Sequence, residues 1–385
     1  MSDNESEGEV CADLSNPDVT TKYRLCGEIV NKAMDAVLKA AAEGKDILEL
    51  CNLGDSIMME ETGKLYNKKQ KDGRKMEKGI AFPTCVSVNE LLGHFSPLKG
   101  ESRELKSGDV AKVDMAVHID GFIAAAAQTI LIGADKVTGK RADVVHAAWN
   151  AAEAALRLVQ PGQKNTQVTE AFAKIAADFG VKPVQGVKSH QLKKHVIDSE
   201  KCILNVANIE EKNEEFEFEL NEVYCLDIVM TTGEGKMRES ELRSTVFKRA
   251  VETNYLLKTQ KARQFISEVN KRFPALPFTI RAIEDEQVAR VGVSEARRHE
   301  LLEEYPVMKD KEGETIAQFK FTVLLLPGGV KRITGMPFDE KSFVTENEVK
   351  DEDLKKLLST SANPKKNKKK AAKKGAEGAK EAAEA

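Results

Sequence analysis

Two segments of the sequence have the apolar spacing of amphipathic helices. Over residues 20–44, apolar side chains recur every three or four positions, and the pattern ends at Gly44. The segment "ADVVHAAWNAAEAALRLVQPG", residues 142–162, repeats this spacing and ends at Pro161 and Gly162. We therefore expect a long helix in each segment, with a further helix following the first one.

Alternation of apolar and polar residues predicts a strand in "AQFKFTVLLLP", residues 317–327. One face is apolar, and the other carries Lys320 at its middle. This lysine lies either on the solvated side of an edge strand or inside the protein for a functional reason. The apolar face comprises Phe319, Phe321, Val323 and Leu325, and the polar face comprises Gln318, Lys320 and Thr322.

The segment "VAKVDMAVHIDGFIAAAAQTIL", residues 110–131, predicts a β-hairpin that turns at the dipeptide "DG", residues 120–121. Pairing outward from this turn places Ala116 opposite Ala125. Asp114 then lies on the same face as Ala125, diagonal to it and about 7 to 8 Å away. Dinuclear sites hold their ions roughly 3.5 to 4 Å apart, so a carboxylate at position 125 would share a metal pair with Asp114. The residue at that position is alanine.

Two pairs of similar strings indicate an internal duplication. "AVLKAAAEG" (residues 36–44) resembles "AALRLVQPG" (residues 154–162), 118 positions later, and "DVAKVD" (residues 109–114) resembles "EVYCLD" (residues 222–227), 113 positions later. The similar offsets predict a repeated unit of roughly 110 to 120 residues, with helices first and strands after. Because the strings are short, coincidence stays an alternative.

Local composition and charge divide the chain into a folded domain and two polar ends. We expect the folded domain to span residues 16–360, with a charged, helix-rich insertion at about residues 250–312. Residues 1–15 are acidic and are expected to be disordered. Residues 361–385 form a lysine-rich tail that is too polar and repetitive to pack, so we expect disorder there as well.

Composition narrows the class of protein. The chain has 385 residues, 41% of them hydrophobic, and a net charge of −3, which suits one large core or two moderate ones. Its six cysteines include no C-x-x-C pair and its start is acidic, which favours a reducing intracellular compartment. No apolar run approaches the ~20 residues that cross a bilayer, so we expect no membrane insertion. We also expect a monomer, because no long exposed apolar face is evident.

Five motifs give the chain a specific resemblance. "GIAFPTCVSVNELLGHFSP", "KVDMAVHIDG", "SHQLKKHVID", "EVYCLDIVMTTGEG" and "AQFKFTVLLLP" occur in the order and at the approximate spacing of the motifs of type 2 methionine aminopeptidases. The resemblance covers roughly residues 16 to 350. It implies an α+β pita-bread fold with two pseudo-symmetric halves and a helical insertion, which agrees with the internal repeat.

The resemblance also implies a metal centre that has lost part of its ligand set. The active family holds two divalent metals with two aspartates, a histidine and two glutamates. Here Asp114 and His190 match the first aspartate and the histidine, and Asp227 replaces the first glutamate. Ala125 and Lys320 replace the second aspartate and the final glutamate, and neither an alanine nor a protonated amine can ligate a metal. We therefore expect no bound metal, no cofactor and no catalytic residue, with Lys320 forming a salt bridge to the remaining carboxylates.

Two further positions correspond to the family's substrate cleft. His94 matches one substrate histidine, whereas Asp198 stands where the family has the other. Two functions that would use this cleft stay open as alternatives. The chain is either an active metallo-aminopeptidase with altered ligation or a scaffold that binds peptides or proteins in the old cleft.

Almost end to end, the sequence is similar to the proliferation-associated, ErbB-receptor-binding proteins, with phrases such as "GIAFPT", "HVIDSEK", "VTEAF" and "FTVLLLP". This similarity implies a protein without peptidase activity that binds structured RNA and the large ribosomal subunit. It implies roles in ribosome biogenesis, translation and transcription control, in the cytoplasm and in the nucleus including the nucleolus. Nuclear coregulators and receptor tails are further candidate partners.

Two basic segments suit phosphate binding, which adds salt-dependent affinity without sequence preference. A solvated loop or a solubilising tail is the alternative for each, and neither segment has the interleaved aromatic residues that would stack on bases. The candidate residues are Lys68, Lys69, Lys71, Arg74 and Lys75 in the internal run, and Lys365, Lys366, Lys368, Lys369, Lys370, Lys373 and Lys374 in the tail.

The string "LKKLL" at residues 354–358 matches the pattern by which helices dock into coregulator grooves. Leu354, Leu357 and Leu358 would form the docking face. Leucines at this spacing more often pack a helix onto its own domain, so packing is the favoured interpretation and docking stays an option.

Overall fold

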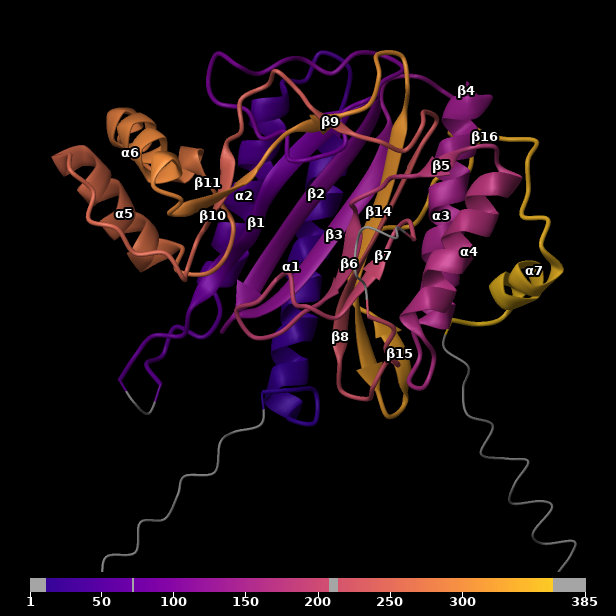
Figure 1. Ribbon diagram of the computed structural model, residues 1–385, viewed down its shortest axis with the longest axis horizontal. Coiled ribbons are helices and arrows are strands. Elements are labelled where there is room, and N and C mark those ends of the chain that lie inside the picture. Colours follow the sequence, from indigo (N-terminus) through magenta and orange to yellow (C-terminus); the bar gives the residue numbers. More distant parts are fainter. Residues whose placement is uncertain (1–11, 71–72, 208–213, 363–385) are drawn as a thin grey trace, which may run out of the picture.

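The computed structural model describes residues 12–70, 73–207 and 214–362. Within these residues, nine strands form one twisted sheet with the order β1-β2-β3-β14-β8-β6-β7, to which β15 adds beside β14 and β5 beside β8 (Figure 1). Their bounds are β1 (Lys78–Val88), β2 (Val110–Ile119), β3 (Phe122–Leu131), β5 (Lys182–Pro183), β6 (Lys188–Gln191), β7 (Cys202–Leu204), β8 (Val223–Thr231), β14 (Ile316–Leu326) and β15 (Gly329–Arg332).

A pair of helices packs on each half of the sheet. In the first half, α1 (Pro17–Ala40) contacts β2 and β3, and α2 (Ile47–Gly63) contacts β1. In the second half, α3 (Lys140–Leu158) contacts β8 and β14, and α4 (Asn165–Asp178) packs against α3. The first residues of α2 and α4 are 118 positions apart, the offset found in the sequence. The duplicated unit and the α+β pita-bread fold are therefore confirmed.

Helix α1 confirms the first predicted helix, but it begins at Pro17 and ends at Ala40, three to four residues before the predicted bounds at each end. The side chain of Asn16 accepts a hydrogen bond from the N–H of Asp18, and Pro17 at the first helical position needs no such partner. The buried stripe that runs from Cys26 to Val37 packs into the core of the first half. A side chain at Gly27 would meet the carbonyl of Ile333, so glycine there allows the chain after β15 to approach α1.

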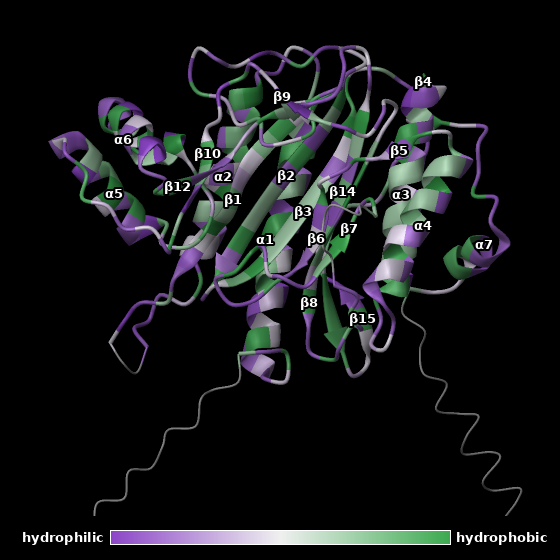
Figure 2. Ribbon diagram, viewed as in Figure 1, coloured by the Kyte–Doolittle hydropathy of each residue, from purple (hydrophilic) through white to green (hydrophobic). Residues whose placement is uncertain are grey.

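Strand β14 lies in the middle of the sheet, between β3 and β8. Its predicted apolar face is confirmed, because Phe319, Phe321, Val323 and Leu325 are buried in the core of the second half. Figure 2 shows the apolar character of the sheet and of the helices that cover it. Lys320 points to the opposite side of a central strand, so the edge-strand interpretation is wrong.

The segment between β8 and β14 contains a separate small subdomain with its own core. A three-stranded sheet in the order β11-β10-β12 packs there with two helices, at the left of Figure 1. The sequence predicted the helices but not the strands, which are too short to show alternation. The elements are β10 (Val246–Arg249), α5 (Gln260–Arg272), β11 (Phe278–Thr279), the 3₁₀ turn η1 (Ile280–Ala282), α6 (Glu286–Arg298) and β12 (Leu302–Tyr305).

Short elements complete the domain. β9 (Arg238–Glu239) pairs with β13 (Met308–Lys309), β4 (Val137–Thr138) pairs with β16 (Phe343–Val344), and α7 (Glu352–Ser359) packs on α3. Leu14 is buried, so the folded part begins before residue 16, where the sequence placed its start. No helix within the described residues is long and apolar enough to span a membrane.

Candidate functional site

Four residues on neighbouring strands form a row across the middle of the sheet. Asp114 on β2 is paired with Ala127 on β3, Ala127 with Lys320 on β14, and Lys320 with Asp227 on β8. Side chains at directly paired positions of a sheet lie on the same face. The register therefore brings two carboxylates and one ammonium group, from distant parts of the sequence, to one place.

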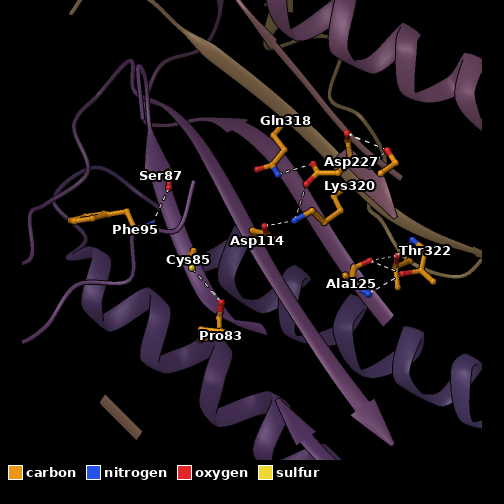
Figure 3. A network of polar contacts seen from close by, with 12 residues as sticks. Pro83, Cys85, Ser87, Phe95, Asp114, Ala125, Asp227, Gln318, Lys320 and Thr322 are labelled. Carbon is orange, nitrogen blue, oxygen red and sulfur yellow. Dashed lines mark hydrogen bonds and ion pairs between the residues drawn. The ribbon is translucent and has the colours of Figure 1, made fainter. Parts of the chain in front are cut away.

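Lys320 forms ion pairs with both carboxylates (Figure 3). Its Nζ atom lies 2.5 Å from Oδ2 of Asp114 and 3.1 Å from Oδ2 of Asp227. Gln318 donates a hydrogen bond to Oδ1 of Asp227 over 2.8 Å, so each oxygen of that carboxylate has a partner. All three charged side chains are at least 83% buried, because their exposed fractions are 15% for Lys320, 8% for Asp114 and 17% for Asp227.

Within this cluster the lysine and the carboxylates stabilise each other's charge, whereas the two carboxylates repel each other. Burial on its own would lower the pKa of Lys320, but the two carboxylates hold the pKa well above its usual value. Burial raises the pKa of Asp114, and the nearby Asp227 raises it further while Lys320 opposes the shift. A single cation is thus shared between two acids, and Lys320 stays protonated at every physiological pH.

Ala125 lies beside this cluster and leaves its position without a ligand atom. Its methyl group faces the cleft described below, and only its backbone is bonded. Thr322 accepts a hydrogen bond from the N–H of Ala125 over 2.9 Å, and Thr334 donates one to its carbonyl over 2.6 Å. The pairing of Ala116 with Ala125 is as predicted from the hairpin.

Two histidines line the same cleft with one ring nitrogen of each bound to the backbone. Nδ1 of His94 lies 3.0 Å from the carbonyl of Pro306, and Nδ1 of His190 lies 3.0 Å from the carbonyl of Ser199. A carbonyl only accepts, so Nδ1 carries the proton in both rings. Burial lowers the pKa of both histidines, which keeps them neutral and leaves each Nε2 as an acceptor.

The cluster forms the floor of a cleft of about 460 Å³. Lys248, which comes from the insertion, forms ion pairs with Asp198 of the cleft wall over 2.6 Å and with Glu303 over 3.1 Å. The structure thus places all seven predicted site positions, Asp114, Ala125, His190, Asp227, Lys320, His94 and Asp198, around one cavity. The apolar walls come from Phe82, Leu92, Ile197, Val229, Met237, Tyr305 and Met308.

The side chains present do not fit a dinuclear metal centre. Both carboxylates are engaged by Lys320, and Ala125 contributes no donor atom. In the part of the chain that the structure describes, no three histidine, cysteine, aspartate or glutamate side chains are grouped so that they could hold a metal ion. We therefore derive no metal-assisted chemistry for this cleft.

Comparison with known proteins identifies the family. Residues 21–241 match the sequence model of metallopeptidase family M24. ErbB-3 binding protein 1 of Solanum tuberosum is 47% identical over 90% of this chain and 89% of its own length, and proliferation-associated protein A of Dictyostelium discoideum is 44% identical over 90% of each. The chain belongs to family M24, among the ErbB-3 binding and proliferation-associated proteins. The curved DNA-binding protein of Schizosaccharomyces pombe is a further relative, 37% identical over 96% of this chain and 97% of its own.

Solved structures agree with this M24 assignment. The structure of a thermophilic Arx1 superposes with a TM-score of 0.83 and 27% identity, over 90% of this chain and 99% of that one. A methionine aminopeptidase from Thermotoga maritima shares the fold, with a TM-score of 0.55 and 17% identity over 85% of this chain and 100% of that one. The more similar relatives are thus named for binding or proliferation. Methionine aminopeptidases are more distant in sequence, and the one from Archaeoglobus fulgidus is 28% identical over 81% of this chain and 97% of its own length.

The internal basic run of this M24 protein lies between α2 and β1 and projects from the body of the molecule (Figure 1). A turn closed by the N–H of Gln70 and the carbonyl of Arg74, 2.8 Å apart, shapes it. Lys68, Lys69, Arg74 and Lys75 are exposed. The other predicted basic residues, Lys71, Lys365, Lys366, Lys368, Lys369, Lys370, Lys373 and Lys374, lie outside the described residues.

The leucines of α7 pack on their own domain. Leu354 is buried, and Leu357 and Leu358 are partly buried against the core of the second half. The interpretation that this motif packs a helix onto its own domain is therefore confirmed. The leucines that would form the docking face pack toward α3 and the core of the second half. A docking role would require α7 to detach first.

Sequence reasoning missed three side chains that shape the cleft. Lys248 and Tyr305 come from the insertion, whose strands gave no pattern, and Gln318 was recognised only as a polar neighbour of Lys320. The alternation of β14 was the one signal that could have assigned Gln318 to the site, because it places residues 318 and 320 on the same face.

Proposed function

We propose that this chain is a non-catalytic growth regulator that associates with RNA and with the large ribosomal subunit. The observation that carries the non-catalytic part is the position of Lys320 between Asp114 and Asp227. Metal-dependent peptidases generate their nucleophile by lowering the pKa of a metal-bound water. A fixed ammonium satisfies the same carboxylates but offers no coordination site for water, so it supplies structure without chemistry.

The family supports the regulatory part of the proposal. Relatives named for ErbB-3 binding and for proliferation cover nearly the whole chain. The resemblance described above implies action in ribosome biogenesis, translation and transcription control, in the cytoplasm, nucleus and nucleolus. We extend these roles to this chain, with coregulators and receptor tails as candidate protein partners.

Exposed positive charges and the name of one relative support the proposal that this chain binds RNA. One relative is named for binding curved DNA. Four exposed cations, Lys68, Lys69, Arg74 and Lys75, lie between α2 and β1, and seven lysines occur among residues 365–374 of the sequence. Such cations bind phosphates through salt-dependent contacts that do not read sequence. This chemistry suits ribosomal RNA, which offers a dense phosphate surface.

Sedimentation of the endogenous protein, with and without ribonuclease, tests the proposal. We expect comigration with large ribosomal subunits that ribonuclease abolishes. We change Lys68, Lys69, Arg74 and Lys75 to alanine in a variant. This variant should dissociate from the particles at a lower salt concentration than the native protein. The matched control changes four exposed lysines elsewhere, Lys136, Lys140, Lys182 and Lys236, and removes the same charge. Failure of the native protein to comigrate would refute ribosome association.

A peptidase assay separates the proposal from its enzymatic alternative. We expect no release of methionine from a Met-Ala-Ser peptide with added cobalt or manganese. Turnover that depends on the added metal would establish the alternative of an active aminopeptidase with altered ligation. The result is independent of the sedimentation experiment.

A further inference from the structure

The cleft keeps a binding cavity although its metal site is gone. It retains about 460 Å³ of space, apolar walls and polar groups at its floor, which is the constitution of a ligand site. Nothing in the proposed association with RNA uses this cavity, because phosphate binding needs exposed cations and these walls are apolar. The chemistry of the floor then decides which ligand fits.

The floor leaves a positively charged ligand no carboxylate that is not already paired. An ammonium group would need the carboxylates of Asp114 and Asp227, and Lys320 already occupies the space between them. Any cation close to these oxygens would also come close to Nζ of Lys320, whose repulsion opposes the attraction of the two acids. A free peptide amino terminus is such a cation at neutral pH.

The histidines favour a neutral hydrogen-bond donor. Each ring holds its own Nδ1 proton against a backbone carbonyl, which leaves the lone pair of Nε2 for a ligand. An amide N–H donates one proton without carrying charge, so it suits this acceptor. Walls that include Met237 and Met308, whose unbranched side chains adapt to different shapes, complement an apolar side chain.

We propose that the cleft binds a neutral peptide segment through an apolar side chain and discriminates against a free amino terminus. An amide N–H takes the place of the terminal ammonium group in this ligand. Two sources offer the same chemistry, namely an N-acetylated chain end and an internal stretch of a polypeptide. Lys320 therefore changes the class of ligand that the cleft accepts, in addition to removing the metal.

Three peptides test the proposal on the full chain by ligand-observed NMR titration. They are H-Met-Ala-Ser-amide with a free amine, Ac-Met-Ala-Ser-amide with a blocked end, and Ac-Ser-Ala-Met-Ala-Ser-amide with an internal methionine. At about pH 6.5 we expect at least one blocked peptide to bind about tenfold more tightly than the free amine. The two blocked peptides show which source fits better, and preference for either supports the proposal.

A pH change isolates the effect of charge. Raising the pH to about 9.5 neutralises the free terminal amine, whose pKa is about 7.7 to 8.0, so the difference between the peptides should shrink. Lys320 and the two histidines keep their charge states over this range, because burial keeps both histidines neutral and the carboxylates hold the pKa of Lys320 well above its usual value. Burial also raises the pKa of Cys225 to about 12, so its thiol stays neutral.

Substitution of the lysine gives an independent measurement. Lys320→Met removes the ammonium and leaves the two carboxylates without a cation, so this variant should prefer the peptide with the free amine. If the variant does not fold, the pH comparison on the native chain still decides the question. Release of methionine during any titration would contradict the non-catalytic function, yet it would leave the order of affinities measurable.

A matched pair of variants locates the binding. Ile197 lines the cleft, whereas its neighbour Val196 is 38% exposed and lies outside it. Ile197→Glu should weaken the binding of the blocked peptides about tenfold or more, and Val196→Glu should not. Three results would overturn the proposal: tighter or equal binding of the free amine at pH 6.5, no binding of any peptide at several millimolar, or equal effects of the two glutamates.

Discussion

The Nζ atom of Lys320 lies 2.5 Å from Oδ2 of Asp114, although 206 positions separate the two residues in the chain. Strand β3 stands between their strands, and Ala127 is paired with both residues. The small side chain at this position leaves room for the lysine to cross to β2. The contact joins the two halves of the repeat at the place where the active family binds its metals. The lysine that replaces a metal ligand therefore also holds the two halves together.

Lys320→Glu alone should not restore peptidase activity, and it should destabilise the protein. It replaces the only cation of the cluster with a third carboxylate, next to Asp114 and Asp227. Breaking a buried ion pair in this way typically costs about 3–5 kcal/mol of unfolding free energy. Denaturant unfolding and methionine release measure the two effects.

Lys331→Glu is the matched control for this variant. It introduces the same charge change on the neighbouring strand β15, at an exposed position. Its effect on the free energy of unfolding should stay within about 0.5 kcal/mol. Equal stability of the Lys320 and Lys331 variants would contradict a stabilising role for the ion pairs.

Metal binding should require two substitutions together. The purified protein should contain no stoichiometric metal, and Lys320→Glu should not change this, because Ala125 still offers no donor atom. Combining Ala125→Asp with Lys320→Glu restores an oxygen ligand at both altered positions, as hard divalent ions require. We expect cobalt or manganese to raise the melting temperature of the double variant only.

Elemental analysis provides the direct measurement for the same prediction. One or two ions bound per native chain would show that the assignment of a lost metal centre is wrong. Thr138→Asp together with Lys320→Glu is the control for added charge, because it places the second carboxylate at an exposed position outside the cleft. Stabilisation of this control by metal would mean that charge, and not the ligand geometry, is responsible.

A second buried lysine predicts how stability depends on pH. Lys112 on β2 is 1% exposed, and burial lowers its pKa to about 7. Between pH 7 and its unfolded pKa of about 10.4, the unfolded chain binds a proton that the folded chain does not. This lysine therefore makes the folded state more stable as pH rises through that interval, by about 1.4 kcal/mol per pH unit.

Comparison of the native chain with Lys112→Met isolates this contribution. The cysteines and tyrosines of the unfolded chain also titrate in this interval, but they affect both proteins equally. The difference in unfolding free energy between them should change with the slope given above. The variant also loses the hydrogen bond from Lys112 to the carbonyl of Asn89, a loss that shifts the difference by a constant amount. A difference that is flat from pH 7 to 10 would contradict the burial of a neutral lysine.

The spacing of apolar and polar residues was sufficient to predict those elements whose sequence has a regular period. The alternation of β14, the hairpin with Ala116 opposite Ala125 and the duplicated unit were all readable, because each rests on spacing within a short stretch. Family resemblance then brought together Asp114, Asp227 and Lys320, which no local pattern connects. The contacts of Lys320 follow from the register of four strands.

Other features depend on tertiary contacts alone. The strands of the insertion are two to four residues long, too short for a period to be visible, so the small sheet and Lys248 were missed. The start of the domain was placed too late because Leu14 is an isolated apolar residue in an acidic segment. Its burial depends on neighbours that are distant in sequence.

Packing of α7 on its domain predicts a loss of stability when its leucines are truncated. Leu354 is 7% exposed and contacts the core of the second half. Leu354→Ala should lower the free energy of unfolding by about 2–4 kcal/mol, because it leaves a cavity beneath the helix. Denaturant unfolding measures this, and a helix reserved for docking would show almost no change.

Lys355→Ala serves as the control on the same helix. Its side chain is 39% exposed and pairs only with glutamates at the surface, so its removal should change stability by less than about 0.5 kcal/mol. A groove on a coregulator could bind α7 only in competition with the core of this protein, against which Leu354 packs. Binding of α7 to such a groove should therefore be weak in the intact protein, and it should strengthen when α7 is presented as an isolated peptide.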